Sequence, residues 1–307
     1  MKPPVTIIVP TVRRPTGLET ALQSLFAQVE VDAVIREIVV VDNDPAGSAW
    51  QMIDSLRRIS PWPLIYVHEP RPGVANARNS ALSATDAPVI AFLDDDETAR
   101  PEWLSRLYAA HLELGSDVTF GPIKGIAIGA TGDSQSWLNA FFSRSGPSKT
   151  QLIDQAYGCG ASIMTRATTL TQSPPFDPDA NATGGEDDRL FARLKQGGAR
   201  FGWAADAWVY EHAPTSRSTP AYALSRAIAY GQSPCQKNFR ARPVRWLSIL
   251  GWMAVGMGQT IIYGGGFIAL KLARRPAAWP MADRAARGLG KLLWMMRLEF
   301  YGTATRG

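Results

Sequence analysis

The chain has 307 residues, of which 46% are hydrophobic, and its formal net charge is +5. This length allows one large α/β domain with an appendage, and the apolar content excludes wholesale disorder. Two cysteines, Cys159 and Cys235, are too few for a disulfide framework, so a reducing compartment fits and both are expected to be buried. The first residues lack the long apolar stretch of a signal peptide, so we expect the catalytic part in the cytoplasm.

The charge is divided unevenly along the chain. Residues 1–236 hold 20 Lys and Arg against 25 Asp and Glu, whereas residues 237–307 hold 12 basic residues against two acidic ones. An acidic body with a basic, apolar tail is not typical of a nucleic-acid-binding protein and indicates docking on an anionic membrane. We therefore expect a catalytic domain over residues 1–236 and a membrane-associating helical region over residues 237–307.

Strand and helix patterns alternate over the first 115 residues. We expect strands at Val5–Val9, Ile35–Val41, Leu64–Val67 and Val89–Leu93, and helices that begin near Thr16, at Ala75 and near Glu102. Thr16 and Glu19 have the spacing of a capping box. This alternation at βαβ spacing predicts an α/β fold with a mostly parallel sheet and helices on both faces.

The pattern loosens beyond residue 120. Gly121–Lys149 is expected to be a variable loop region, Cys159–Met164 a strand and Glu186–Gln196 a helix. The expected catalytic domain then divides into two halves, residues 1–115 and residues 116–236.

Polar residues follow three of the expected strands: Pro10-Thr11, Asp42-Asn43 and the acidic run Asp94–Glu97. In open α/β sheets ligands bind at this carboxyl edge. Adjacent carboxylates raise one another's pKa unless a cation is present. The acidic run is either a solvated turn before a helix or the holder of a divalent ion and a diphosphate.

Two further features carry possible chemistry. Glu186 and Asp187 follow two glycines at an expected helix start, where a carboxylate either caps the helix or acts as a general base toward a hydroxyl. His212 ends an extended run and is either structural or a metal ligand, whereas His68 and His111 are expected to be structural.

Six motifs occur in one order across residues 5–212. They are Thr6-Ile-Ile-Val-Pro-Thr11, Val39-Val-Val-Asp42-Asn43, Gly73-Val-Ala-Asn-Ala-Arg78-Asn79, Phe92-Leu-Asp-Asp-Asp96, Gly184-Gly-Glu-Asp187 and His212. This order resembles the inverting family-2 glycosyltransferases with a GT-A fold, of the kind that assembles bacterial polysaccharides. The resemblance implies transfer of a sugar from a nucleotide-sugar donor to an acceptor hydroxyl. It also implies that residues 1–115 are the nucleotide-binding half and residues 116–236 the acceptor half.

The resemblance also implies roles for individual residues. The donor site would comprise Pro10, Thr11, Arg13, Asp42, Asn43, Arg78, Asp94 and Asp95. Asp42 would read the nucleotide base, which favours UDP, although dTDP and GDP are also used in the family. Mn²⁺ or Mg²⁺ would be bound by Asp94, Asp96 and His212. Asp187 would be the general base, and Glu186 would orient the acceptor.

The processive synthases of this family carry a Gln-x-x-Arg-Trp motif. Here Arg245-Trp246 is present, but residue 242 is Arg rather than Gln. We therefore expect transfer of a single sugar, with a lipid-linked glycan as the acceptor, at the cytoplasmic face of the inner membrane.

Residues 246–270 carry no charge and are long enough to span a bilayer. Gly264-Gly265-Gly266 is expected to break a helix here, and the basic residues on both sides oppose a simple span. We expect a segment in the membrane plane or a re-entrant one. A second interfacial helix would follow, with an apolar face formed by Leu289, Leu292, Leu293, Met296 and Phe300. A soluble helical subdomain is the alternative.

Two other functions stay open at this point. A sugar nucleotidyltransferase would share the nucleotide-binding layout but has no use for Glu186 and Asp187. A membrane-tethered cation-binding module without catalysis explains the acidic run and the tail, but not Asp42, Arg78 or His212.

Overall fold

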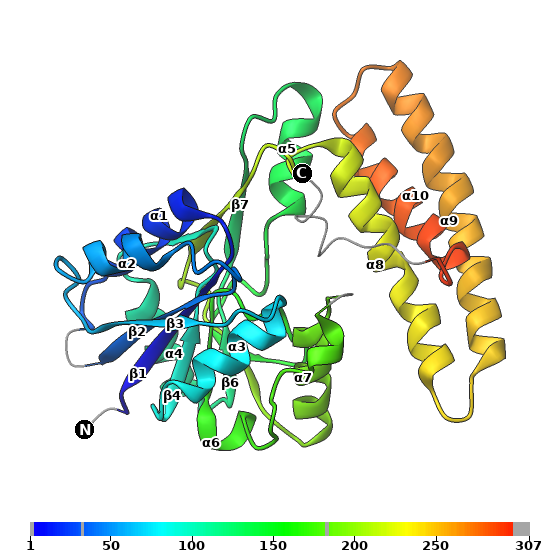
Figure 1. The fold of residues 1–307 in the computed structure, drawn as a ribbon. Helices are drawn as coiled ribbons and strands as arrows, with labels where there is room; N and C mark the ends of the chain where they lie inside the picture. The colour runs from blue at the N-terminus through cyan, green and yellow to red at the C-terminus, as the bar shows by residue number, and fades with distance from the viewer. Residues whose placement is uncertain (1–2, 32–33, 182–183, 297–307) are drawn as a thin grey trace. The chain divides into compact units, whose positions relative to one another are not determined.

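The computed structural model describes residues 3–31, 34–181 and 184–296. Within these ranges, residues 3–124 and 143–212 form one compact unit, and residues 125–142 and 213–296 form a second (Figure 1). The boundary expected at residue 236 falls inside helix α8 (Pro220–Arg240). The extent of the catalytic domain therefore stays a prediction.

An eight-stranded sheet forms the centre of the first unit, in the order β3-β2-β1-β4-β9-β6-β10-β8. The strands are β1 (Val5–Thr11), β2 (Ile35–Asp42), β3 (Leu64–His68), β4 (Val89–Phe92), β6 (Val118–Phe120), β8 (Gln151–Ile153), β9 (Ser162–Thr165) and β10 (Phe201–Trp203). Strands β1 to β4 are mutually parallel, as are β6 and β10, whereas β9 and β8 pair antiparallel with their neighbours. The prediction of a mostly parallel α/β sheet is confirmed.

Alternation along β1 distributes the core between the two faces of the sheet. Ile7 packs with residues of α1 (Pro15–Phe26), α2 (Trp50–Leu56) and α4 (Trp103–Leu114). Ile8, the next residue, faces the opposite side and packs with α3 (Val74–Ser83) and α7 (Glu186–Gln196). Successive side chains of a strand point to opposite faces, and Val5–Val9 of β1 are all buried, so helices have to cover both sides of the sheet, as predicted.

Three local predictions are wrong. Helix α1 begins at Pro15, without a side-chain cap from Thr16, because proline at the first helical position already has the φ of a helix. The strand expected from Cys159 begins only at Ser162, since Ala161 has a φ of 50°. Gly121–Lys149 is not simply a loop, because it contains β7 (Ile123–Ala127) and α5 (Gln135–Phe141).

The remaining elements are short. They are β5 (Glu97–Ala99), β11 (Val209–Ala213), α6 (Arg166–Thr169) and the 3₁₀ turns Gly132–Ser134 and Pro178–Ala180. Strands β5 and β11 pair antiparallel, with Thr98 opposite Tyr210. This pairing places the end of β11 beside the turn that follows β4.

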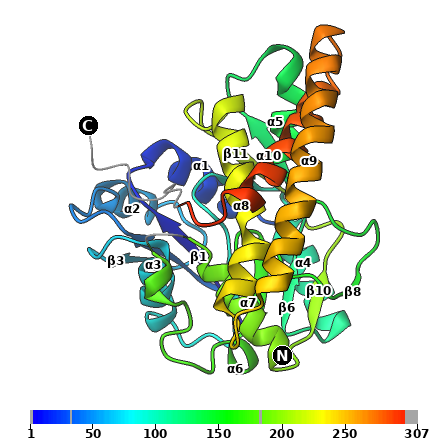
Figure 2. The ribbon, with the colours of Figure 1, turned by 90° about the vertical axis from the view of Figure 1, so that its right-hand side faces the viewer.

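Helices α8, α9 (Trp246–Leu272) and α10 (Ala278–Leu292) pack together in the second unit (Figure 2). Glycines permit the contact: a Cβ on Gly290 would lie 2.0 Å from the carbonyl oxygen of Ile228, and one on Gly256 would lie 2.7 Å from that of Gly288. Such close backbone approach through small residues is also found in membrane helix pairs.

Helix α9 is continuous through Gly264–Gly266, so the expected helix break is wrong. Each glycine lowers helix stability by about 1 kcal/mol relative to alanine, and a helix of 27 residues tolerates this loss. Among the described residues α9 alone has the length and composition of a membrane span, and 6% of its most apolar stretch is buried. The second interfacial helix was expected to have an apolar face that includes Leu289, Leu292 and Phe300. Leu289 and Leu292 lie within α10 and are half-buried, and Phe300 lies outside the described residues.

Candidate functional site

Asp94, Asp95 and Asp96 lie in the turn between β4 and β5, at the carboxyl edge of the sheet. The side chain of Asp94 is 36% exposed and that of Asp96 16%, whereas that of Asp95 is 7% exposed. Burial raises the pKa of Asp95 to about 6, although the Arg14 guanidinium opposes the shift. Thr11 Oγ1 donates a hydrogen bond of 2.8 Å to the Asp95 carboxylate. Asp95 therefore anchors the turn, and Asp94 and Asp96 are the acids open to a ligand.

Arg14 is a site residue that the sequence analysis missed. Its Nη1 lies 2.8 Å from both Asp95 Oδ1 and Asp96 Oδ2. Arg13, which the sequence places in the donor site, instead pairs with Asp44 at 3.1 Å. Arg13 has a left-handed backbone conformation, with a φ of 52°. At this bend the side chains of Arg13 and Arg14 diverge, and they contact different acids. Two adjacent arginines after a strand at the ligand edge were the available signal.

Arg78 is the centre of a buried ionic cluster. It lies on α3, is 4% exposed, and its Nη1 is 2.7 Å from Glu186 Oε1. The same nitrogen contacts Asp187, and Nη2 lies 3.6 Å from Asp94 Oδ1. Its Nε is buried with no hydrogen-bond partner among the described residues. One cation therefore joins acids that are more than 90 residues apart in the sequence.

Glu186 and Asp187 begin α7, directly after Gly185, whose φ is 86°. Burial and the neighbouring Asp187 carboxylate raise the pKa of Glu186 to about 8. Burial also raises the pKa of Asp187, but Arg78 and a 2.8 Å hydrogen bond from the backbone N–H of Cys159 outweigh it and lower the pKa. Within this pair Glu186 is therefore the acid that holds a proton more readily, and Asp187 is the acid that ionises more readily.

A second arginine, Arg144, lies behind the acidic turn and was also missed. Burial raises the pKa of Glu97 well above its usual range, and Arg144 opposes that shift. Glu97 Oε2 accepts a 3.0 Å hydrogen bond from the backbone N–H of Asp94. A Cβ on Gly160 would lie 2.7 Å from oxygens of both Asp94 and Glu97. Glycine therefore lets the backbone pass close to these carboxylates.

Asp42 and Asn43 lie at the carboxyl end of β2, as expected, and both side chains bind the backbone. Asp42 is fully buried, and its oxygens accept hydrogen bonds from the N–H groups of Asp44 at 3.0 Å and Ala49 at 2.7 Å, and from the Tyr66 hydroxyl at 3.1 Å. Because the Asp42 side chain is fully buried, contact with a nucleotide base requires the groups around it to move.

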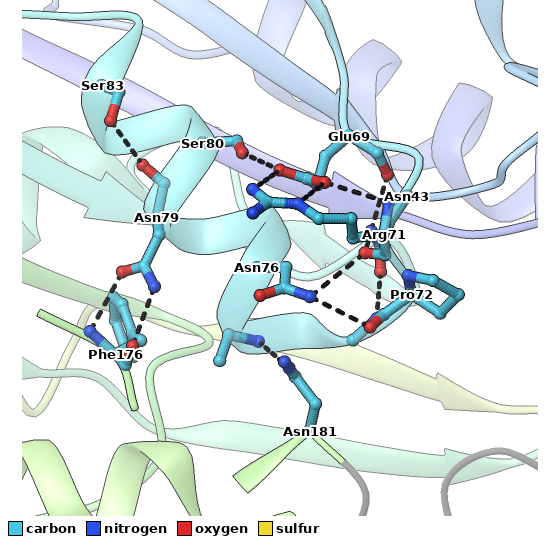
Figure 3. A network of polar contacts seen from close by, with 12 residues as sticks. Asn43, Glu69, Arg71, Pro72, Asn76, Asn79, Ser80, Ser83, Phe176 and Asn181 are labelled. Carbon is cyan, nitrogen blue, oxygen red and sulfur yellow. Dashed lines mark hydrogen bonds and ion pairs between the residues drawn. The ribbon is translucent and has the colours of Figure 1, made fainter. Parts of the chain in front are cut away.

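The Asn43 side chain holds the loop that leads into α3 (Figure 3). It donates to the carbonyl oxygens of Glu69 at 2.8 Å and Arg71 at 2.7 Å, and accepts from the N–H of Gly73 at 2.7 Å. On the far side of α3, Asn79 exchanges two hydrogen bonds with the backbone of Phe176. Both ends of the network fix the helix that carries Arg78.

His212 lies on β11, next to the acidic turn. Its backbone N–H donates to the carbonyl oxygen of Asp96 at 2.7 Å, and its Nε2 lies 2.8 Å from the Thr98 hydroxyl. Burial lowers its pKa, and Asp96 only partly offsets this, which favours the neutral imidazole that a metal ligand must have. In the part of the chain that the structure describes, no three His, Cys, Asp or Glu side chains already converge as a metal-binding group.

Known proteins resemble this chain in sequence and in fold. Residues 6–170 match the family model described as "Glycosyl transferase family 2". The succinoglycan biosynthesis protein ExoM of Rhizobium meliloti (strain 1021) is 31% identical over 236 residues, which cover 75% of this chain and 73% of that protein. An uncharacterized glycosyltransferase of Nostoc, alr2836, is 27% identical over 34% of this chain and 31% of its own.

Two solved structures of S. aureus TarS residues 1–349 share the fold. The one in complex with UDP has a TM-score of 0.55 at 17% identity and covers 94% of this chain and 89% of that one. The other has a TM-score of 0.54 at 18% identity, with the same coverage. The expected GT-A fold is therefore confirmed, and this chain belongs to glycosyl transferase family 2.

Proposed function

We propose that this glycosyltransferase moves one sugar from a UDP-sugar to the hydroxyl of a lipid-linked glycan, with inversion, during polysaccharide assembly. The observation that carries the proposal is the ionic cluster around Arg78, which joins the acidic turn after β4 to the first residues of α7. The succinoglycan relative supports polysaccharide assembly, and the UDP complex of TarS supports the nucleotide.

A divalent ion, Mn²⁺ or Mg²⁺, fits the oxygen donors of Asp94 and Asp96, with neutral His212 on the strand beside them. When bound, the ion would neutralise the negative charge that develops on the leaving diphosphate. Arg14 donates a hydrogen bond to Asp96, so Arg14 would compete with the ion for this carboxylate. Its guanidinium is also a cation at the acidic turn that could bind the diphosphate.

We assign the nucleotide to the carboxyl edge of β1 and β2. Thr11 and Pro10 end β1, and Asp42 and Asn43 lie beside them because Pro10 pairs with Val41 and Thr11 with Asp42. Of the two acids at the end of β2, Asp42 is the proposed reader of the base. Arg13 supports this edge by fixing Asp44.

Asp187 is the proposed general base. It is ionised, its side chain is 19% exposed, and Arg78 and the Cys159 N–H hold both its oxygens in place. It takes the proton of the acceptor hydroxyl as that oxygen attacks the anomeric carbon and the bond to the diphosphate breaks. Protonated Glu186 donates a hydrogen bond and positions the acceptor. A single displacement inverts the anomeric centre.

The proposed location is the cytoplasmic face of the inner membrane, where lipid-linked acceptors are available. The exposed apolar helix α9 and the surplus of basic residues beyond residue 236 support it.

Calorimetric titration of UDP with Mn²⁺, Mg²⁺ or EDTA tests the donor and the metal together. We expect binding that requires the ion, and an Asp96→Asn variant that has lost most of the affinity because the carboxylate charge is gone. dTDP and GDP serve as competing nucleotides, and a UDP-sugar transfer assay follows. Equal UDP affinity in all three conditions, together with an unaffected Asp96→Asn variant, contradicts the metal assignment.

A further inference from the structure

Helix α9 presents an uncovered apolar surface along its whole length. Leu247 is 86% exposed, Leu272 81%, Ile262 70% and Ile261 68%. Six more large apolar side chains of α9 are also exposed: Trp246, Leu250, Trp252, Val255, Met257 and Ile268. A soluble surface rarely leaves so many large apolar groups adjacent to one another.

Six of these ten side chains lie in one row along the helix, whereas Trp252, Val255 and Ile262 lie outside that row. Leu247, Leu250, Ala254, Met257, Ile261, Ile268 and Leu272 follow the three- and four-residue spacing of one helical face, with Gly265 in the same row. The exposed row, named here the α9 stripe, contains no charged residue. At 1.5 Å per residue, the 27 residues of α9 make it about 40 Å long.

The opposite face of α9 lies against a charged helix. Arg284 of α10 stacks on the ring of Tyr263 at 5.3 Å, and Lys291 Nζ lies 2.9 Å from Gln259 Oε1. Asp283 and Arg287 pair with each other on α10 between these two contacts. If α9 spanned a bilayer, it would carry these four charges to the membrane interior, because they lie beside its central turns. Each such charge disfavours insertion by roughly 100-fold.

The ends of α9 carry exposed arginines. Arg242 and Arg245 precede it, and Arg274 and Arg275 follow it. Basic groups at both ends of an apolar surface match the phosphate groups of anionic lipids when both ends lie at one membrane surface.

From these observations we propose that α9 lies in the plane of an anionic membrane, with the α9 stripe immersed and α10 on the aqueous side. This deepens, and rests on, the proposed membrane location, but it does not depend on the transfer chemistry. The continuous helix removes the re-entrant alternative, and the charges of α10 remove the spanning one. Interfacial helices of this kind immerse their apolar face about 5–10 Å.

Nitroxide depth measurements test the orientation. Single cysteines replace Leu250, Ile261 and Ile268 in the full chain, with Cys159 and Cys235 changed to serine or alanine and the chain reconstituted in vesicles of phosphatidylglycerol and phosphatidylcholine. We expect the three labels at one depth, about 5–10 Å, and a label at Arg284 accessible to a water-soluble nickel reagent. Ile261 near the bilayer centre, with Leu250 and Ile268 shallower and Arg284 shielded from nickel, overturns the proposal in favour of a span.

Vesicle flotation tests the surface itself. Ile261→Glu should weaken binding at least tenfold, whereas Ile59→Glu, at an exposed apolar residue of the first unit, serves as the matched control and should leave binding unchanged. Changing the four arginines to glutamine should weaken binding to anionic vesicles on the order of 1,000-fold. Unchanged flotation of Ile261→Glu, or a detergent-free dimer that the Leu250→Cys variant cross-links through its new thiol, refutes the proposal. UDP titration of the same samples separates this failure from a failure of the proposed transfer.

Discussion

Replacement of Arg78 by methionine should destabilise the first unit in a strongly pH-dependent way. Arg78 is 4% exposed and is the cation shared by Asp94, Glu186 and Asp187, so its removal leaves three carboxyls without their common counter-ion. Breaking a buried ion pair on one side costs about 3–5 kcal/mol. Methionine keeps most of the volume, so the loss reports the charge rather than a cavity.

The sign of the pH dependence follows from the acids that remain. Without Arg78 their folded-state pKa values lie above the unfolded ones of about 4, so the folded chain binds extra protons. Stability is then retained near pH 4–5 and falls as the pH rises. We expect the loss of unfolding free energy to reach about 3–5 kcal/mol at pH 8 and to be roughly halved at pH 5.

Urea denaturation followed by tryptophan fluorescence at pH 5, 7 and 8 measures this loss. Arg36→Met is the matched control, because Arg36 and its partner Asp86 are both exposed, with side chains 42% and 84% accessible. Such a surface pair contributes about 0–1 kcal/mol. A loss for Arg78→Met that is equal at all three pH values, or no larger than that of the control, refutes the ionic account of the cluster.

Three further predictions concern single residues. Asn43→Ala should lower the free energy of unfolding, measured by heat or urea, by about 2–4 kcal/mol, because three hydrogen bonds to the loop before α3 are lost. Asn76→Ala is the control: it loses only solvent-exposed hydrogen bonds and should change the free energy of unfolding by less than about 0.5 kcal/mol. Glu186→Gln should flatten the fall in stability that we expect between about pH 4.5 and pH 8, because a carboxyl with a folded pKa of about 8 loses stabilisation as the pH rises through that window. Arg14→Gln should raise the affinity for Mn²⁺ alone, measured by calorimetry, by up to about fivefold, because the guanidinium no longer competes for Asp96.

Local signals were sufficient for much of the fold. The structure gives α7 the predicted bounds, Glu186–Gln196, because two glycines precede it and its acids and apolar residues follow helical spacing. Strands β1 to β4 were recognisable as apolar runs bounded by turn residues. Because parallel strands end at one edge of a sheet, the sequence alone predicted that the acidic turn lies at the same edge as Thr11 and Asp42.

Contacts between residues that are far apart in the sequence could not be predicted in the same way. Two adjacent arginines after a strand were the available signal for Arg14, and no motif contains Arg144. For both residues only the folded chain shows which acids they contact. Asp42 is a strand-end acid in the sequence, but its bonds to Ala49 and Tyr66 depend on how the next loop turns. The glycine triplet of α9 was read as a break because propensity is local, whereas the packing of α10 along that helix is not.

The last prediction separates the general base from its neighbours. In Asp187→Asn the amide oxygen can still accept the N–H of Cys159, so the loop should keep its position, but the side chain can no longer take a proton. We expect kcat to fall by about 10²–10⁴-fold and UDP affinity to change less than about threefold, because the base acts in the transition state. Asp188 is the control, because it is exposed and lies about 100° further round α7. In Asp188→Asn we expect kcat to fall less than about fivefold. Both are measured with a radiolabelled-sugar transfer assay beside UDP titrations. An inactive Asp188→Asn with an active Asp187→Asn shifts the base by one residue, and two active variants place the base outside α7.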